Sequence, residues 1–272
     1  MEQILVLMAG LVYPGLLLAL VLGVIYRRLL GATAGSVRLA EALRSREGAA
    51  CLVGLLAAGV GVAGLPWPYH PAQATHAWVW SWAALEVAFL VPLAPALATG
   101  VPKVVRSAAR RAQIGVLGRA FLWLALGSAL TIHDTWSMAA LPAHLLALGA
   151  VVVAFPIAVG WGPFDDEISL GGAGLEAGLP PELRHLSTLA RDVATAALLA
   201  ITLVAVLPTG IVPPWLALIQ ILAAFIVVSL ILRRMAGRLP RLPLLTSLRI
   251  GWAYAAPLAG AACAALLLVP RG

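Results

Sequence analysis

Apolar stretches long enough to cross a lipid bilayer recur along the whole chain, separated by short polar segments. A helix needs about 20 mainly apolar residues to cross the hydrocarbon core, and eight stretches approach this length. The expected spans are Ile4–Tyr26, Ala49–Leu65, Ala77–Thr99, Gln113–Thr131, Met138–Gly160, Val193–Leu207, Pro214–Leu232 and Ile250–Val269. The pattern predicts an all-α, polytopic helical bundle of about eight transmembrane helices, forming a single integral membrane domain over residues 1–272.

Basic residues collect in every second loop of this arrangement. The loops after spans one, three, five and seven hold 16 of the 18: Arg27, Arg28, Arg38, Arg44, Arg46, Lys103, Arg106, Arg110, Arg111, Arg184, Arg191, Arg233, Arg234, Arg238, Arg241 and Arg249. The loops after spans two, four and six hold none. Because short cytoplasmic loops carry the excess of lysine and arginine, we expect the basic loops in the cytoplasm and both termini outside. Four tryptophans fall at the outer ends of spans, where we expect them at headgroup depth: Trp67, Trp78, Trp136 and Trp215.

Composition supports lipid as the main solvent of this chain. The sequence is 62% hydrophobic and 11% charged, with a mean hydropathy of +1.00. The net charge of +7 lies in short loops between apolar runs, so it argues for membrane orientation and against nucleic-acid binding.

Cys51 and Cys263 lie in apolar runs without a Cys or His at ligand spacing, which argues against a metal or iron–sulfur centre in this chain. Any redox centre therefore belongs to a partner. Glu2 before the first run and Arg27 after it are the reverse of a cleaved signal peptide, so we expect a retained span.

The longest loop, from Trp161 to Asp192, is acidic where the other loops of its side are basic. It holds six of the eleven acidic residues: Asp165, Asp166, Glu167, Glu176, Glu182 and Asp192. Such a loop is suited to docking another protein, and a solvated connector is the alternative. Its glycines Gly171, Gly172 and Gly174 do not indicate a nucleotide site, because no strand precedes them and no Gly-Lys-Ser follows.

Two ionisable residues lie inside the expected spans. Glu86 is in the third span, where a carboxyl group marks a proton or ion path or else stays protonated and structural. Arg119 is in the fourth span, and its long stem is expected to reach the cytoplasmic interface, with pairing to a carboxylate on another helix as the alternative. The remaining candidates are histidines without metal-ligand spacing, expected as interfacial polar groups: His70, His76, His133 and His144.

Three segments of the chain resemble one known family. They are Gly160-Trp161-Gly162-Pro163-Phe164-Asp165-Asp166 after span five, Arg110 with Ile114-Gly115-Val116 at the entry to span four, and Pro240-Arg241, Arg249, Gly251-Trp252 and Pro257-Leu258 leading into the last span. These segments resemble, in the expected order, the membrane-anchor subunit of respiratory complex I, the NADH dehydrogenase subunit 1 family. Its relatives include formate hydrogenlyase subunit 4 and the matching subunits of group 4 energy-converting nickel–iron hydrogenases. The resemblance covers the region from span three to the C-terminus.

The resemblance implies a non-catalytic membrane subunit of a multisubunit oxidoreductase in a prokaryotic plasma membrane. Hydrogenase-like large and small subunits, holding iron–sulfur clusters and a nickel–iron centre, would dock on its cytoplasmic face, and antiporter-like subunits would lie beside it in the membrane. The expected docking residues are Asp165, Asp166, Glu167, Glu176, Arg110, Arg111, Arg241 and Arg249. Opposite fixed charges on one face suit the orientation of a soluble partner. The chain is shorter than typical complex I versions, which favours the hydrogenase branch, although quinone stays open as a ligand.

Departures from the family pattern fall at carboxylates that the family is thought to use in proton movement. This chain has other residues at those positions: Ala158, Arg111, Arg119, Gly172 and Leu245, with Trp161 in place of an arginine. The carboxylates that could substitute in a proton path are Glu86, Glu167 and Glu176. Two rival functions remain, a complex I subunit with a quinone chamber and a stand-alone secondary transporter, although the sequence has no convincing internal repeat.

Overall fold

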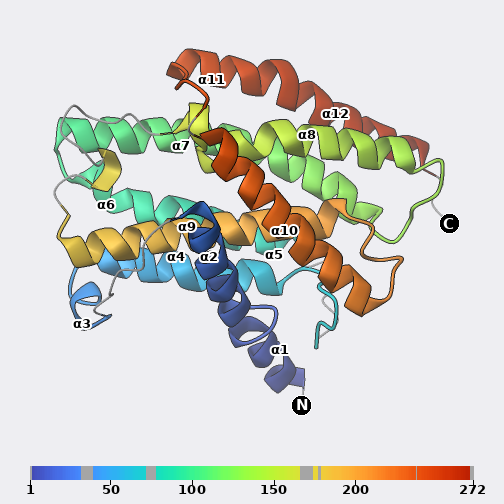
Figure 1. Cartoon of the computed structure of the whole chain (residues 1–272), viewed down its shortest axis with the longest axis horizontal. Helices are drawn as coiled ribbons and strands as arrows, with labels where there is room; N and C mark the ends of the chain where they lie inside the picture. The colour runs from blue at the N-terminus through green and yellow to red at the C-terminus, as the bar shows by residue number, and fades with distance from the viewer. Residues whose placement is uncertain are drawn as a thin grey trace. The chain divides into compact units, whose positions relative to one another are not determined.

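The computed structural model describes residues 2–31, 39–71, 78–165, 174–176, 179–236 and 238–269. Every regular element among these residues is helical (Figure 1). Within the same ranges, eight helical segments are long and apolar enough to span a membrane: Met8–Leu30, Arg46–Ala63, Trp78–Ala98, Pro102–Thr131, Leu141–Val159, Pro181–Val206, Pro214–Met235 and Leu244–Leu268. The predicted all-α bundle of eight spans is thereby confirmed. The placement of both termini outside stays a prediction.

The chain forms two compact units. Unit one comprises Met1–Ala112 and Asp166–Leu198, and unit two comprises Gln113–Asp165 and Leu199–Gly272. The chain passes from one unit to the other three times: within α7 (Pro102–Thr131), between Asp165 and Asp166, and within α9 (Pro181–Val206). Whether the units act as one membrane domain stays a prediction.

Unit one is organised around α4. Besides parts of α7 and α9 it contains α1 (Glu2–Leu11), α2 (Leu16–Leu30), α3 (Leu39–Ala42), α4 (Arg46–Ala63), α5 (Trp78–Leu90), the short helix η1 (Val91–Leu93), α6 (Ala94–Ala98) and η3 (Gly174–Glu176). Helix α4 packs against both α2 and α5 (Figure 1). Glycines make this packing close: a Cβ on Gly59 would lie 2.7 Å from Cα of Leu16, and one on Gly61 would lie 2.7 Å from Cγ of Leu85. Small residues let apolar helices approach in lipid, where no hydrophobic driving force joins them.

Unit two contains the second half of the chain's spans. Its elements are α8 (Leu141–Val159), η2 (Gly162–Phe164), α10 (Pro214–Ala236), α11 (Leu244–Ile250), the π-helical turn η4 (Gly251–Ala255), α12 (Ala256–Ala265) and η5 (Leu266–Leu268), with the remainders of α7 and α9. Helices α8 and α12 lie side by side (Figure 1). The last span runs through α11, η4 and α12, and its wide π turn comes directly before Pro257. A proline lacks the N–H that a regular helix would use there, which is consistent with the change of helix type.

Several boundaries differ from the prediction: the fourth, sixth and eighth spans are longer, whereas the third and fifth, Trp78–Ala98 and Leu141–Val159, are shorter. The fourth span begins at Pro102, so Arg106, Arg110 and Arg111 are helical instead of forming a loop. The sixth begins at Pro181, so the expected acidic loop ends there and Asp192 lies on α9. The first turns of α7 and α9 carry many polar residues, and for this reason an apolar window misses them. The first span is also divided, because α1 ends at Leu11 and Pro14 lies between it and α2.

The expectation that His133 and His144 are interfacial is wrong, because both are buried. Nε2 of His133 lies 3.1 Å from Oγ1 of Thr209, and Nε2 of His144 donates to the Thr135 carbonyl at 3.1 Å. Burial lowers the pKa of His133 below its ordinary value of 6.5. Each of these histidines therefore bonds through its ring to a loop residue of unit two. His76 lies outside the described residues.

Trp67 is also buried, in contrast to its predicted place at headgroup depth. Its Nε1 donates to the Val62 carbonyl at 3.0 Å, and His70 lies 2.8 Å from the Ala63 carbonyl. The two rings thus satisfy carbonyls at the end of α4, which have no partner within the helix.

Candidate functional site

Two of the segments that carry the family resemblance meet in unit two, at a surface that we call the turn junction (Gly162–Asp165 and Pro240–Leu242). Helix α8 ends at Gly160, whose φ of 65° is the left-handed conformation that glycine adopts most easily. The chain then turns through η2, and the Pro163 carbonyl accepts a hydrogen bond from the backbone N–H of Leu242 at 2.9 Å. Oδ2 of Asp165 lies 3.7 Å from Nη2 of Arg241. The two side chains are 43% and 41% exposed, so they remain accessible to a partner.

Part of the third resembled segment, Ile114–Val116, lies in the same unit, whereas Arg110 belongs to unit one. A Cβ on Gly251 would come 3.1 Å from Cδ2 of Leu117 on α7. The next residue, Trp252, meets Phe121 of α7 edge to face, with ring centroids 5.1 Å apart. The Gly-Trp pair of the last span therefore packs just beyond Ile114–Val116, at the entry to the fourth span.

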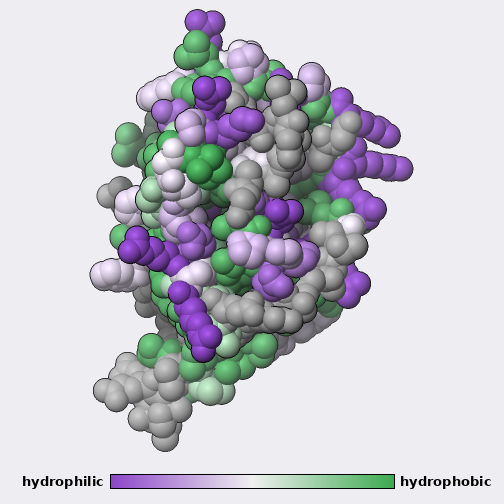
Figure 2. Space-filling model, turned by 90° about the vertical axis from the view of Figure 1, so that its left-hand side faces the viewer, coloured by the Kyte–Doolittle hydropathy of each residue, from purple (hydrophilic) through white to green (hydrophobic). Residues whose placement is uncertain are grey.

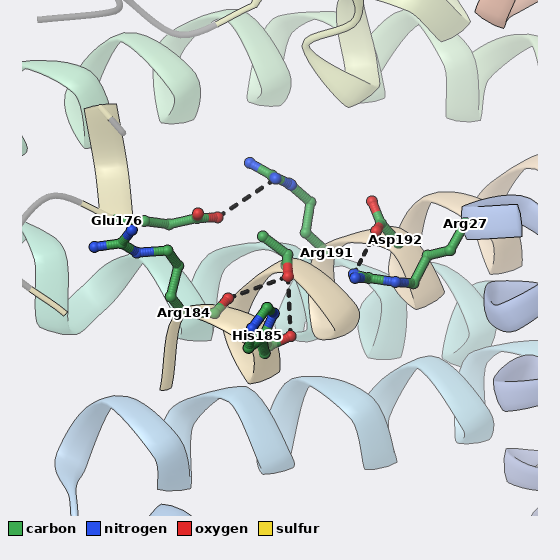
Figure 3. Close-up of polar contacts among 7 residues, drawn as sticks. Arg27, Glu176, Arg184, His185, Arg191 and Asp192 are labelled. Atoms are coloured by element: carbon green, nitrogen blue, oxygen red, sulfur yellow. Dashed lines mark hydrogen bonds and ion pairs between the residues drawn. The ribbon is translucent and has the colours of Figure 1, made fainter. Parts of the chain in front are cut away.

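Unit one holds a second group of charges, which we call the carboxylate cluster: Arg27, Glu176, Arg184, Arg191 and Asp192 (Figure 3). Its geometry begins with Gly23 on α2, where a Cβ would lie 2.4 Å from Cγ2 and 2.9 Å from Cα of Val193 on α9. One turn after Gly23 comes Arg27, and one residue before Val193 comes Asp192. The contact therefore sets these side chains in register, with 2.9 Å between Nη1 of Arg27 and Oδ2 of Asp192. The two side chains are only 13% and 18% exposed.

Glu176 is the second carboxylate of the cluster. Its Oε1 lies 3.4 Å from Nη2 of Arg191 (Figure 3), and this buried oxygen has no hydrogen-bond partner within the part of the chain that the structure describes. Burial raises the pKa of Glu176 above its ordinary value of 4.5, whereas the positive charges of Arg191, Arg111 and Arg184 oppose that effect. The result is a carboxyl group that binds a proton more readily than a solvated glutamate does.

A pocket lies beside the cluster, within unit one. Its volume of about 40 Å³ is open to water-sized molecules, and Leu175 lines it next to Glu176. This volume holds roughly three water molecules. Other lining residues come from the break in the third span, Pro92 and Pro95, and from α4, Glu47 and Cys51. The pocket thus offers room for water next to Leu175, the neighbour of Glu176 in the chain.

The structure separates the predicted docking residues into exposed and buried groups. Arg241 and Asp165 are accessible at the turn junction, and Arg249 is exposed on α11. Arg110 and Arg111 are 6% and 8% exposed on α7, so the expectation that they form an exposed basic loop is wrong. They lie within the helical part of the chain because α7 begins earlier than the apolar window indicated. Asp166 and Glu167 lie outside the described residues.

The ionisable residues of the spans also differ in their surroundings. Glu86 is half-buried on α5, and it is not part of the carboxylate cluster. Arg119 is 3% exposed, so the expectation that it reaches a solvated interface is wrong and pairing inside the protein is favoured. The Arg27–Asp192 pair could not be predicted from the sequence, since only the contact between α2 and α9 at Gly23 brings the two residues together.

Comparison with known proteins adds no family to these observations. No family model matches the chain, and no curated protein matches it. Among the residues that the structure describes, no group of three or more His, Cys, Asp or Glu could hold a metal ion.

Proposed function

We propose that this chain is the membrane-anchor subunit of a multisubunit, hydrogenase-like oxidoreductase. The observation that carries the proposal is the meeting of its resembled segments in unit two. The Pro-Phe-Asp turn bonds to the Pro-Arg segment through Leu242 and Arg241, and the Gly-Trp pair packs on α7. Segments that resemble one family and lie far apart in the sequence would have no reason to converge if each resemblance were accidental.

The docking chemistry of the proposal rests on the exposed charges of unit two. Asp165, Arg241 and Arg249 would meet complementary charges of hydrogenase-like subunits in the cytoplasm, and charge complementarity of this kind sets orientation and partner choice. Iron–sulfur clusters and the nickel–iron centre would belong to those subunits. Antiporter-like subunits would lie beside the helices in a prokaryotic plasma membrane. Quinone remains an alternative ligand, in which case the assembly would show quinone-dependent activity.

A role in proton transfer is the second part of the proposal, and Glu176 supports it. Its pKa is raised, its Oε1 accepts no hydrogen bond from the described residues, and its neighbour Leu175 lines a pocket with room for water. A proton carrier needs a pKa near the working pH and a route for water.

The titration of Glu176 is directly measurable by infrared difference spectroscopy. We expect a protonated-carboxyl band whose midpoint lies above 4.5 and which is absent from Glu176→Gln. The pKa of Glu176 is higher in the folded protein than in the unfolded chain. Protonated Glu176 therefore stabilises the fold at pH values below its pKa in the unfolded chain, and this stabilisation is lost as the pH rises through its pKa in the folded protein. The stability of Glu176→Gln should therefore vary less over this range. A band with a midpoint at or below 4.5 would remove Glu176 from the proton path.

Charge reversal at the turn junction tests the docking role. We expect Asp165→Arg to lower the recovery of companion subunits in mild detergent by at least about tenfold, because like charges set against each other at an interface repel strongly. The double variant Asp165→Arg with Arg241→Asp restores the ion pair within the chain but exchanges the positions of the two charges that a partner would meet. We therefore expect it to keep the stability of the wild type and also to lose the companion subunits. Lys103→Gln, an exposed charge on α7, serves as the control. Full recovery of companions with the swapped pair would contradict docking at this junction.

A further inference from the structure

Unit two carries a set of exposed arginines, of which the proposed docking uses only Arg249. We call Arg233, Arg234, Arg238 and Arg249 the arginine collar, and all four are exposed. Helices α10 and α11, which carry three of them, both contact η2. No acidic residue follows Asp192 in the sequence. The collar therefore gathers positive charge in a stretch of chain that supplies no carboxylate.

The collar begins where a lipid-facing surface ends. Helix α10 buries a single stripe, consisting of Ala217, Ile221, Phe225, Ser229 and Leu232. Its other side chains from Trp215 to Ile231 are exposed or half-buried, over a rise of about 24 Å at 1.5 Å per residue. Arg233 and Arg234 follow directly. This length approaches the hydrocarbon thickness of a bilayer, so the arginines come at the depth of lipid headgroups.

Exposed apolar side chains alternate with the arginines of the collar. Met235 and Leu239 are 43% and 40% exposed between Arg234 and the end of the segment. On the last span, Leu245 and Trp252 are 70% and 64% exposed on either side of Arg249, at a spacing that places all three on one helix face. Figure 2 shows strongly hydrophilic and hydrophobic residues next to one another on the face that it views.

From this alternation we infer that the arginine collar binds the phosphate groups of anionic phospholipids. Guanidinium groups pair with phosphate through two parallel hydrogen bonds, and Leu and Trp side chains next to them need acyl chains or the headgroup boundary. A soluble acidic protein would satisfy the charges but leave the apolar side chains in water. The membrane surface satisfies both. The inference goes beyond the proposed function and does not rest on it, since it needs only that α10 and the last span cross a bilayer.

Lipid titration followed by native mass spectrometry tests this inference on the protein extracted in mild detergent. The probes are phosphatidylglycerol, phosphatidylcholine with the same acyl chains, and inorganic phosphate. We expect phosphatidylglycerol to bind in preference to the other two. Replacing Arg233, Arg234 and Arg238 together by glutamine should weaken that binding on the order of a hundredfold, since each arginine near a membrane surface contributes roughly fivefold.

Two further variants separate a built site from general attraction. Replacing the three arginines by lysine should restore most of the binding, because the charge is kept. Replacing Arg44, Lys103 and Arg106, exposed cations of unit one, by glutamine should change it by less than about threefold. Three results would each overturn the inference. The two glutamine variants could lose lipid binding equally, or both lipids could bind the wild type equally well. The collar variant could also keep its lipid but lose companion proteins.

Discussion

Replacing Asp192 with leucine should lower the free energy of unfolding by about 3 kcal/mol, because it leaves Arg27 as a largely buried cation without its carboxylate. The pair joins α2 to α9 at 2.9 Å, and both side chains are mostly excluded from solvent. Removing one partner of such a pair destabilises much more than removing both. The double replacement Arg27→Leu and Asp192→Leu should therefore recover most of the lost stability. Unfolding in mild detergent, followed by circular dichroism, measures the difference.

Glu182→Leu is the matched control for this prediction, since it removes a half-exposed carboxylate from the first turn of the same helix. We expect it to change stability by less than about 1 kcal/mol. The account of the Arg27–Asp192 pair would be wrong if Asp192→Leu were as stable as the control, or if the double replacement were as unstable as the single one.

Replacing Gly118 with alanine should cost about 3 kcal/mol, by forcing α7 and α8 apart in unit two. The added Cβ would lie 2.4 Å from N and 2.7 Å from Cα of Ala158, and 2.7 Å from the carbonyl carbon of Ile157. All three are backbone atoms of α8, so no side chain can turn aside to make room. The helices must separate, and contacts along the whole interface weaken. The same unfolding measurement applies.

Gly260→Ala provides the comparison on α12, because nothing lies within 4 Å of its added Cβ. Alanine is the better helix former, so this replacement should be neutral or stabilising by up to about 1 kcal/mol. If Gly118→Ala were as stable as Gly260→Ala, close packing at Ala158 would not hold α7 against α8.

The number and order of the spans could be predicted because hydrophobicity alone decides them. All eight expected stretches have a matching helix, and α10 begins at the predicted Pro214. The starts of α7 and α9 could not be predicted in the same way. Their first turns carry Arg106 and Arg184, and a search for apolar windows excludes such turns even though helix geometry tolerates them.

In the candidate site, too, features that depend on nearby residues could be predicted, whereas contacts between helices far apart in the sequence could not. Opposite charges at Asp165 and in the basic segment before the last span were expected on one face, and the contact between Asp165 and Arg241 is consistent with this. The role of Gly23 could not be predicted, because it depends on which helix lies beside α2. Helix–helix neighbours are set by packing between residues far apart in the sequence, and a single sequence carries no direct sign of them.

The mass of the particle that mild detergent extracts from the native membrane tests the central claim most directly. If the chain is a membrane anchor, this 28.2 kDa polypeptide should be recovered in a much larger particle, together with iron–sulfur proteins and further membrane subunits. Recovery of the polypeptide by itself, carrying only lipid and detergent, would contradict the account and favour a stand-alone transporter.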